Sequence, residues 1–246
     1  MAPSLKRPLE GIRVTGLEQY MAGPYCKMLL ADAGAEVIKI ERPGVGDPRR
    51  SMPPFAEKDG KKKAAGFMGY NRNKKSLALN LRDPKGQEIF ELLTAQSDVV
   101  VENLRPGSMS KMGLGQKDMR ALQPELIWAT ISGFGCNEDY LGPYSDRPAF
   151  DIVAESMSGI MNLVGFADKP PSWTIYGMAD VYSGQVTAYG IMQALFMRER
   201  TGEGQFVDSA MFDNMLALNE SMIALHSVSG QNPQRGVFKN LWPPGA

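Results

Sequence analysis

The sequence predicts an α/β protein with a Rossmann-like parallel sheet, helices on both faces of that sheet, and a helical extension. Two observations support this fold class. Strand-like and helix-like segments alternate through the first half of the chain, and helix-like segments dominate after Gly133. The segment DVVVE at 98–102 is a nearly continuous run of valines. Such a run is typical of a strand buried on both faces of a parallel sheet.

The first half of the chain begins with a predicted strand at 11–17 (GIRVTGL) and a helix at 22–33. Gly23 and Pro24 mark the start of that helix, and Gly34 marks its end. The polar stretch 41–73 is rich in Gly, Pro and Lys, and loops of this length are usually functional or mobile. Further strands are expected at 36–40, 76–81, 98–102 and 126–132, and further helices at 84–96, 108–112 and 116–121.

In the second half, helices are expected at 150–163, 181–200 and 210–227, with one short strand at 205–209. Apolar residues of the segment 181–200 recur at a spacing of three to four, as a packed helix requires. The tail 230–246 is rich in Pro and Gly, which is the composition of a linker. We therefore expect one large domain over residues 1–229, followed by a linker over 230–246.

Composition indicates an ordinary globular protein, with 43% hydrophobic and 22% charged residues. Because 27 Lys and Arg balance 27 Asp and Glu, overall charge favours neither a nucleic-acid nor a membrane partner. Residues 1–85 carry 17 Lys and Arg against 9 Asp and Glu. This surplus fits an anionic ligand or, more simply, a solvated charged face.

Several kinds of site and location are disfavoured by what the sequence lacks. Two cysteines, Cys26 and Cys136, form neither a disulfide framework nor a metal-binding pattern, and His226 is the single histidine. We therefore expect no metal. No apolar run approaches the ~20 residues of a membrane span, and the N-terminus lacks the apolar core of a signal peptide. A cytoplasmic location is expected.

Asp180 is the candidate with the most specific surroundings, in the segment YGMADVYSGQ. It lies between a small-residue turn and the predicted helix at 181–200. One interpretation is an N-cap, because Asp accepts hydrogen bonds from the free amides of a first helical turn. The other is a nucleophile, which the same amides and the helix dipole would keep ionised at neutral pH. Position alone leaves both interpretations open.

The loop 16–24 after the first strand is the second candidate, because ligands of doubly wound sheets bind at the carboxyl ends of strands. The loop lacks the G-x-G-x-x-G pattern, so NAD is not expected, and the chain contains neither a P-loop nor a G-x-S-x-G elbow. A polyphosphate needs several cationic donors. Candidates are Arg42, Arg49, Arg50, Lys61, Lys62, Lys63, Arg72, Lys74, Lys75 and Arg82, although the run 61–63 fits a solvated loop better.

These segments together resemble a known family. The blocks ADAGAEVIKIERPG, NRNKKSLALNLRDPKG, VVVENLRPG, GMADVYSGQ and RERTGEGQFVDSAMFD occur in order between Pro8 and Asp213. This combination is similar to the class III coenzyme A transferases, a family with formyl-CoA transferases, carnitine CoA-transferases and 2-methylacyl-CoA racemases. The resemblance implies an enzyme that moves CoA from an acyl-CoA thioester to a carboxylic acid.

In this family the aspartate at the position of Asp180 is the nucleophile, and it passes through an acyl-aspartyl anhydride and an aspartyl-CoA thioester. The resemblance further implies that CoA is a substrate and that no cofactor is bound permanently. Backbone near Met21 and Ala22 would line the thioester site. The other contacts with CoA would come from Arg42, Leu79, Arg82, Asn103, Leu104 and Lys111.

The chain also departs from the family's patterns. Phe150 stands where the racemases have a histidine base, and a phenyl ring moves no proton, so a racemase is disfavoured. Met21 stands where some formyl-CoA transferases have an amide side chain. The resemblance implies an interlocked homodimer of longer chains with a second, smaller domain, and we expect that domain to be missing from the given residues. A truncated module that binds CoA with little turnover is therefore the alternative function.

Overall fold

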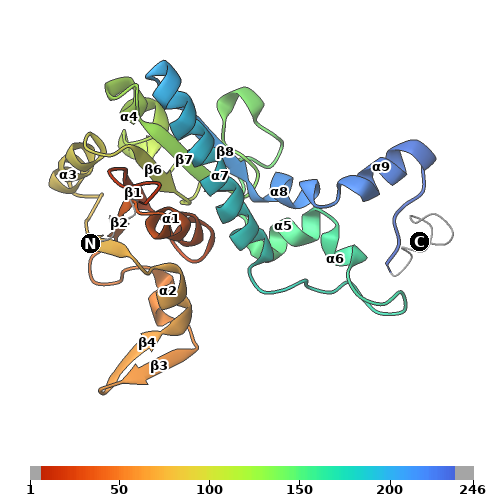
Figure 1. The fold of residues 1–246 in the computed structure, drawn as a ribbon. Helices are drawn as coiled ribbons and strands as arrows, with labels where there is room; N and C mark the ends of the chain where they lie inside the picture. The colour runs from red at the N-terminus through yellow and green to blue at the C-terminus, as the bar shows by residue number, and fades with distance from the viewer. Residues whose placement is uncertain (1–6, 236–246) are drawn as a thin grey trace, which may run out of the picture.

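The computed structural model, drawn in Figure 1, describes residues 7–235. Its centre is a sheet of six strands in the order β5-β2-β1-β6-β7-β8. Every pair of neighbouring strands in this sheet is parallel. Val14 of β1 lies opposite Val37 of β2 on one side and Val99 of β6 on the other. The predicted α/β fold with a parallel sheet is therefore confirmed.

The elements of the sheet and its helices follow one another along the chain. The strands of the main sheet are β1 (Arg13–Leu17), β2 (Glu36–Glu41), β5 (Lys74–Ala78), β6 (Val99–Glu102), β7 (Ile127–Ser132) and β8 (Phe206–Ala210). The helices are α1 (Ala22–Asp32), α2 (Ala65–Tyr70), α3 (Pro84–Thr94), α4 (Gln116–Leu122), α5 (Asp151–Met157), α6 (Ile160–Leu163), α7 (Met178–Thr201), α8 (Met211–Ala217) and α9 (Glu220–Ser229). Short 3-10 turns are η1 (Pro48–Ser51), η2 (Ser110–Met112) and η3 (Glu138–Tyr140).

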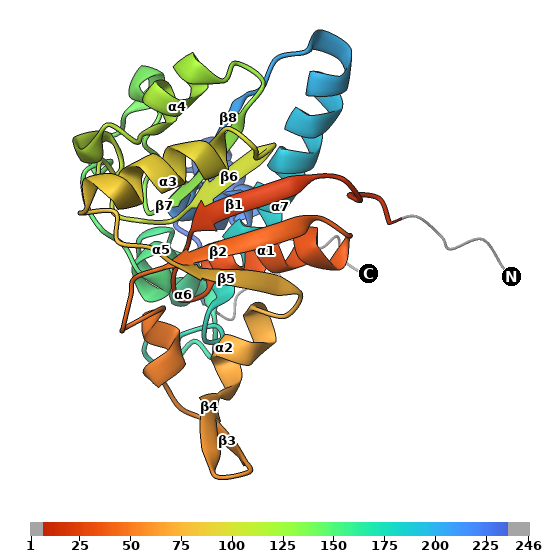
Figure 2. The ribbon, with the colours of Figure 1, turned by 90° about the vertical axis from the view of Figure 1, so that its left-hand side faces the viewer.

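Helices cover both faces of the sheet, as Figure 2 shows for α3 and α4 on one face and α1 and α7 on the other. Two apolar clusters fill the layers between them. One joins alternate residues of β1, β6 and β7 to α1 and α7, and the other joins the intervening residues to Phe90 of α3 and Met119 of α4. All four residues of β6 are buried, which confirms the interpretation of its valine run. Burial of apolar side chains on both faces is the main force that holds this arrangement together.

The order of the strands creates a switch point between β1 and β6. From β1 the chain proceeds outward to β2 and β5, then returns to β6 on the other side of β1 and continues to β7 and β8. The loops that leave the carboxyl ends of β1 and β6 therefore run in opposite directions and open a crevice between them. In sheets of this type, ligands bind in that crevice.

The stretch 41–73 is more structured than its composition predicts. It contains η1, a small antiparallel hairpin of β3 (Phe55–Lys58) and β4 (Lys61–Ala64), and α2. The basic run 61–63 forms most of β4, and its side chains are exposed. The exposure of this run agrees with the interpretation as a solvated loop, but the run forms a hairpin strand, so the loop itself was a wrong expectation. Strand β5 also starts two residues earlier than predicted and ends at Ala78.

Two predicted helices are interrupted, and one begins earlier than expected. Gly159 has a positive φ of 82° and separates α5 from α6. Between α8 and α9, the side-chain amide of Asn219 donates a hydrogen bond of 2.7 Å to the Ser158 carbonyl, which ties this junction to the first one. Helix α7 begins at Met178, three residues before its predicted start. This last difference changes the position of Asp180 within the helix.

The predicted linker falls mostly outside the described residues, because the description stops at 235. The boundary between the predicted large domain and the linker therefore stays a prediction. Among the described helices, none combines the length and the apolar character that a membrane crossing requires.

Candidate active site

Asp180 lines a cleft of about 230 Å³ at the carboxyl ends of β1, β6 and β7. Gln19, Tyr20 and Ala22 of the loop between β1 and α1 line the same cleft. The Asn103 side chain after β6 accepts a hydrogen bond of 2.8 Å from the Gln19 amide and donates one of 2.9 Å to its carbonyl. These two hydrogen bonds fix the two loops of the switch point to each other. The predicted position of the site, at the first strand–helix loop, agrees with this geometry.

The start of α7 is set by Gly177, which occupies the N-cap position with a φ of +88°. A left-handed backbone of this kind favours glycine. A side chain here would also collide with Met21, because a Cβ would lie 2.2 Å from the Met21 Cε. Met21 thus packs beneath the turn that precedes Asp180. Asp180 itself is the third residue of the helix, so the interpretation of this residue as the N-cap is wrong.

The free amides at this helix start are held by another carboxylate, that of Asp151 on α5. Asp151 Oδ1 accepts hydrogen bonds from the Ala179 amide (2.7 Å) and the Asp180 amide (3.1 Å). Its Oδ2 accepts one from the Gly177 amide at 3.1 Å. Asp151 is buried, at 7% exposure, and it lies at the N-terminal end of its own helix. It therefore anchors the residue that is the candidate nucleophile.

Asp180 is half-buried, and its ionisation differs from the sequence-based expectation. Burial raises the pKa of its carboxyl, the nearby Asp151 charge raises it further, and Arg49 opposes both, with a result of about 7. The amides that were expected to keep Asp180 ionised donate to Asp151 instead. The expectation of a fully ionised carboxylate is therefore wrong for the chain as described. Near pH 7 the charged and neutral forms are present in similar amounts.

Asp151→Asn is expected to lower the pKa of Asp180 from about 7, because the substitution removes a neighbouring negative charge that disfavours the ionised form. The carboxyl carbon of Asp180 can be titrated by NMR in protein labelled with ¹³C-aspartate. Asp213→Asn on α8 is the matched control, since Asp213 is not among the groups that shift Asp180. A pKa that stays the same or rises in Asp151→Asn would contradict the electrostatic role of Asp151.

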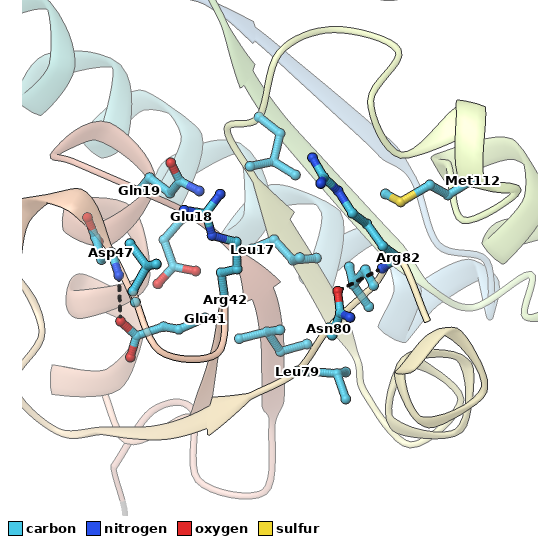
Figure 3. A pocket seen from close by; sticks show the side chains of 15 residues that line it. Leu17, Glu18, Gln19, Glu41, Arg42, Asp47, Leu79, Asn80, Arg82 and Met112 are labelled. Carbon is cyan, nitrogen blue, oxygen red and sulfur yellow. Dashed lines mark hydrogen bonds between the residues drawn. The ribbon is translucent and has the colours of Figure 1, made fainter. Parts of the chain in front are cut away.

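A larger cavity, of about 480 Å³, adjoins this cleft and shares Gln19 and Leu104 with it. Its volume is within the range of small-molecule sites. Four of the predicted CoA contacts line it. Figure 3 shows Arg42, Leu79 and Arg82, and Leu104 is the fourth. Arg42 and Arg82 are exposed and have no carboxylate partner within the described residues. The cavity therefore combines apolar side chains with these two arginines and with three carboxylates, those of Glu18, Glu41 and Asp47, which pair with other cations.

The remaining predicted residues are placed differently. Ala22 lines the cleft with Asp180 and begins α1, whereas Met21 is buried beneath Gly177. Asn103 lines the cleft, but its amide group is occupied by Gln19. Lys111 is exposed on η2, beside Met112 of the larger cavity. The structure thus brings most of the predicted CoA-binding residues to the carboxyl ends of the strands. Their contacts with CoA stay predictions.

Beneath the loop between β1 and α1 lies a buried cluster of charged side chains. Glu18 is fully buried, and its carboxylate lies 2.9 Å from Lys27 Nζ, 3.3 Å from Lys39 Nζ and 3.6 Å from Lys74 Nζ. Burial alone would raise the pKa of Glu18, but the three lysines lower it below its usual value. Lys39 also donates to Asp47 at 2.9 Å. Asp47 in turn accepts hydrogen bonds from the backbone amides of Tyr20 and Arg49. The cluster therefore holds the loop between β1 and α1 and the turn η1 together.

Asp151 and Glu18 are the two site residues to which the sequence analysis assigned no role. Asp151 had a detectable signal, because Glu155 follows it by four residues on the same helix. Glu155 is buried and accepts hydrogen bonds from Trp173 Nε1 (3.0 Å) and Thr174 Oγ1 (2.6 Å) in the segment before α7. A pair of carboxylates at this spacing lies on one face of a helix. Glu18 had no comparable signal, since its lysine partners come from distant parts of the sequence.

The site therefore comprises a switch-point cleft, a half-buried aspartate and an adjoining cavity with two arginines, and comparison with known proteins identifies the class of protein. The chain belongs to CoA-transferase family III, which it matches over residues 9–244. The family resemblance expected from the sequence is therefore confirmed.

The similarity can also be stated for individual members of this family. The chain is 44% identical over 229 residues to the succinyl-CoA:mesaconate CoA-transferase of Haloarcula marismortui, which covers 92% of this chain and 57% of that protein. It is 38% identical over 231 residues to the human succinyl-CoA:glutarate CoA-transferase, covering 93% and 51%. The crystal structure of a CaiB/BaiF family protein from Brucella suis is 38% identical, with a TM-score of 0.88, covering 94% of this chain and 60% of that one. The chain thus spans little more than half the length of the relatives it matches.

Proposed function

We propose that the protein is a CoA-transferase that moves CoA from an acyl-CoA thioester to a carboxylic acid, with Asp180 as the covalent nucleophile. The observation that supports it best is the placement of Asp180 in the switch-point cleft, beside a cavity lined by Arg42 and Arg82, which pair with no carboxylate of residues 7–235. Relatives at 38–44% identity are named CoA-transferases, with succinyl-CoA as the donor in the two cited above. CoA is a substrate in this proposal, and no permanently bound cofactor is needed.

The reaction proceeds through two covalent states of Asp180. Its carboxylate oxygen attacks the thioester carbonyl carbon, the C–S bond breaks, and CoA leaves as a thiolate, which forms an acyl-aspartyl anhydride. The thiolate then attacks the aspartyl carbonyl, and the donor acid leaves as a carboxylate. The acceptor carboxylate then attacks the aspartyl carbonyl of the aspartyl-CoA thioester, which releases CoA thiolate and leaves a new anhydride. The thiolate attacks the acyl carbonyl of that anhydride, which gives the new acyl-CoA and frees the carboxylate of Asp180. Charge and protons balance, since one carboxylate enters and one leaves.

Each tetrahedral intermediate needs hydrogen-bond donors at its oxyanion. Helix α1 begins at Ala22, on the wall of the Asp180 cleft, and no side chain caps its first turn. The amides of Ala22 and Gly23 have no partner within their helix, because an α-helix leaves its first amides free. We assign these amides to the oxyanion. A racemase has less support, because Phe150, at the position of the racemase base, packs edge-on against the Tyr20 ring.

Trapping the covalent intermediates tests the proposal directly. The protein is incubated with succinyl-CoA and hydroxylamine, and Asp180 is examined by peptide mass spectrometry. A hydroxamate at Asp180 is expected, because hydroxylamine cleaves both the anhydride and the thioester. Asp213→Asn is expected to be trapped equally, whereas Asp180→Ala is expected to give no adduct. Retention of CoA without any modification of Asp180 would favour the alternative, a CoA-binding module.

The assembly state is a further proposal. Family resemblance implies a homodimer, and α7 carries exposed aromatic side chains at Tyr189 and Phe196, which are 65% and 59% exposed. Large apolar side chains grouped on one surface are typical of faces that another chain or segment covers. Sedimentation of the protein at its natural length tests the dimer.

A further inference from the structure

The cleft that contains Asp180 is lined by more positive than negative side chains. Arg105, which follows β6, and Arg147, in the segment before α5, both line it. Of the described residues on its walls, Asp180 alone carries a carboxylate. Neither guanidinium comes within ion-pair distance of a carboxylate, or donates a hydrogen bond, among residues 7–235. A second anion in the cleft, beside Asp180, would therefore balance the charges.

The Arg147 side chain is held by an aromatic ring and not by an anion. Its guanidinium carbon lies over the Tyr144 ring, 4.7 Å from the ring centre. The Tyr144 ring packs against Phe134 with 5.5 Å between ring centres, and Phe134 packs against Phe212 of α8 at 5.9 Å. An arginine that stacks on a ring uses one face, whereas its N–H donors lie at the edge of the guanidinium plane. The ring thus supports Arg147 and leaves its donors available for an anion.

The proposed reaction brings an anion into this cleft in every cycle. When Asp180 is the aspartyl-CoA thioester it is neutral, and the acceptor acid arrives as a carboxylate. The donor acid leaves the anhydride in the same form. The phosphates of CoA are assigned to the side of Arg42 and Arg82, which line the larger cavity and not the cleft. The anion that meets the cations of the cleft is therefore the carboxylate of the acid.

We propose that Arg147 binds the reacting carboxylate of the acid and directs it at Asp180. One carboxylate oxygen accepts hydrogen bonds from the guanidinium, and the other attacks the aspartyl carbonyl. Hydrogen bonds between two charged groups are stronger than neutral ones, so they can hold a small acid in place. The same contact receives the donor acid when it leaves. The inference rests on the proposed function and adds to it a residue that binds the group all acceptor acids share.

The test compares two ligands that differ in the reacting carboxylate. Succinate carries it, whereas a 3-carboxypropyl thioether of CoA carries only the distant carboxylate of the same acyl group and cannot be cleaved. Both are titrated into Asp180→Asn protein at its natural length, in which a neutral amide replaces the acylated aspartate. Adding Arg147→Gln is expected to weaken succinate by about 10- to 100-fold and to leave the thioether unchanged, as loss of charge-assisted hydrogen bonds predicts. NMR with ¹³C-labelled succinate and calorimetry with the thioether give the dissociation constants.

Further substitutions in the same protein separate this role from a general loss of structure. Arg200→Gln is the matched control, because the Arg200 guanidinium also lies over a ring, 4.3 Å from the centre of Phe196. Asp180 and Arg200 stand near opposite ends of α7, about 30 Å apart at 1.5 Å per residue, so both affinities are expected to stay the same. Tyr144→Leu is expected to weaken succinate, since it removes the ring that supports Arg147. Tyr144→Phe keeps the ring and is expected to keep the affinity.

Three results would overturn the inference. They are an equal loss for succinate and the thioether in Arg147→Gln, an unchanged affinity for succinate, and no saturable binding of succinate by the Asp180→Asn protein. No bond forms in these titrations, so the expected pattern in a protein that transfers no CoA would contradict only the proposed function. A protein that exchanges CoA, yet binds succinate equally well without Arg147, would contradict only the inference.

Discussion

Asp180→Ala is expected to abolish CoA exchange, with a loss on the order of 10³-fold or more, as removal of a covalent nucleophile causes in other enzymes. The reason is specific to this route. Without the carboxylate no anhydride forms, and the free acid would have to attack the thioester unaided. Exchange of labelled succinate into succinyl-CoA measures the effect. Asp180→Asn is expected to behave in the same way, since an amide is a poor nucleophile.

Binding of CoA is expected to survive these substitutions. The side chains assigned to CoA lie mainly in the larger cavity, which Asp180 does not line. Asp168→Asn, in the exposed segment before α7, is the matched control and is expected to keep full activity. Exchange by Asp180→Ala at more than a few per cent of the wild-type rate would show that the reaction does not pass through this carboxylate.

Glu18→Gln is expected to destabilise the fold by about 3–5 kcal/mol, the usual effect of breaking a buried ion pair. The substitution keeps the volume of the side chain but removes the anion that three lysines share. Lys39 retains Asp47, whereas Lys27 and Lys74 lose their only carboxylate among the described residues. Chemical unfolding of the two proteins gives the difference in free energy.

Glu36→Gln provides the comparison, because Glu36 pairs with Arg13 and Lys75 but is one-third exposed. Pairs at the surface contribute about 0–1 kcal/mol. If the two variants lost the same stability, the buried cluster would carry no special energetic role. Combining Glu18→Gln with Lys74→Met should recover part of the loss, since the double substitution removes one of the unpaired cations.

Much of the fold was predictable because its signals are local. Valine runs mark the central strands, and glycines mark where helices end, so the parallel sheet and most helices follow from the sequence. The hairpin of β3 and β4 was missed because its lysine-rich strand is wholly exposed and shows no apolar alternation. The breaks at Gly159 and Asn219 were missed for another reason. Both depend on a contact between two helix pairs that are distant in sequence.

The candidate site was predictable in position but not in electrostatics. Asp180 was singled out by its surroundings, and the family blocks supplied the residues around the larger cavity. Its ionisation, however, depends on Asp151, which is 29 residues away in sequence and takes the helix amides for itself. Arg49 was visible only as one member of a basic stretch. Its burial and its contact with Tyr176 arise from folding of the whole domain.

The division of tasks between two aspartates has a consequence for turnover. Asp180 must become a neutral acyl derivative and then a carboxylate again in every cycle. Had it been the residue that fastens the start of α7, each cycle would have loosened the helix at the moment when the bulky adduct needed support. Asp151 takes no part in the proposed covalent steps, and it is the residue that accepts hydrogen bonds from the three backbone amides. The covalent steps at Asp180 can therefore repeat without breaking the hydrogen bonds that hold the start of α7.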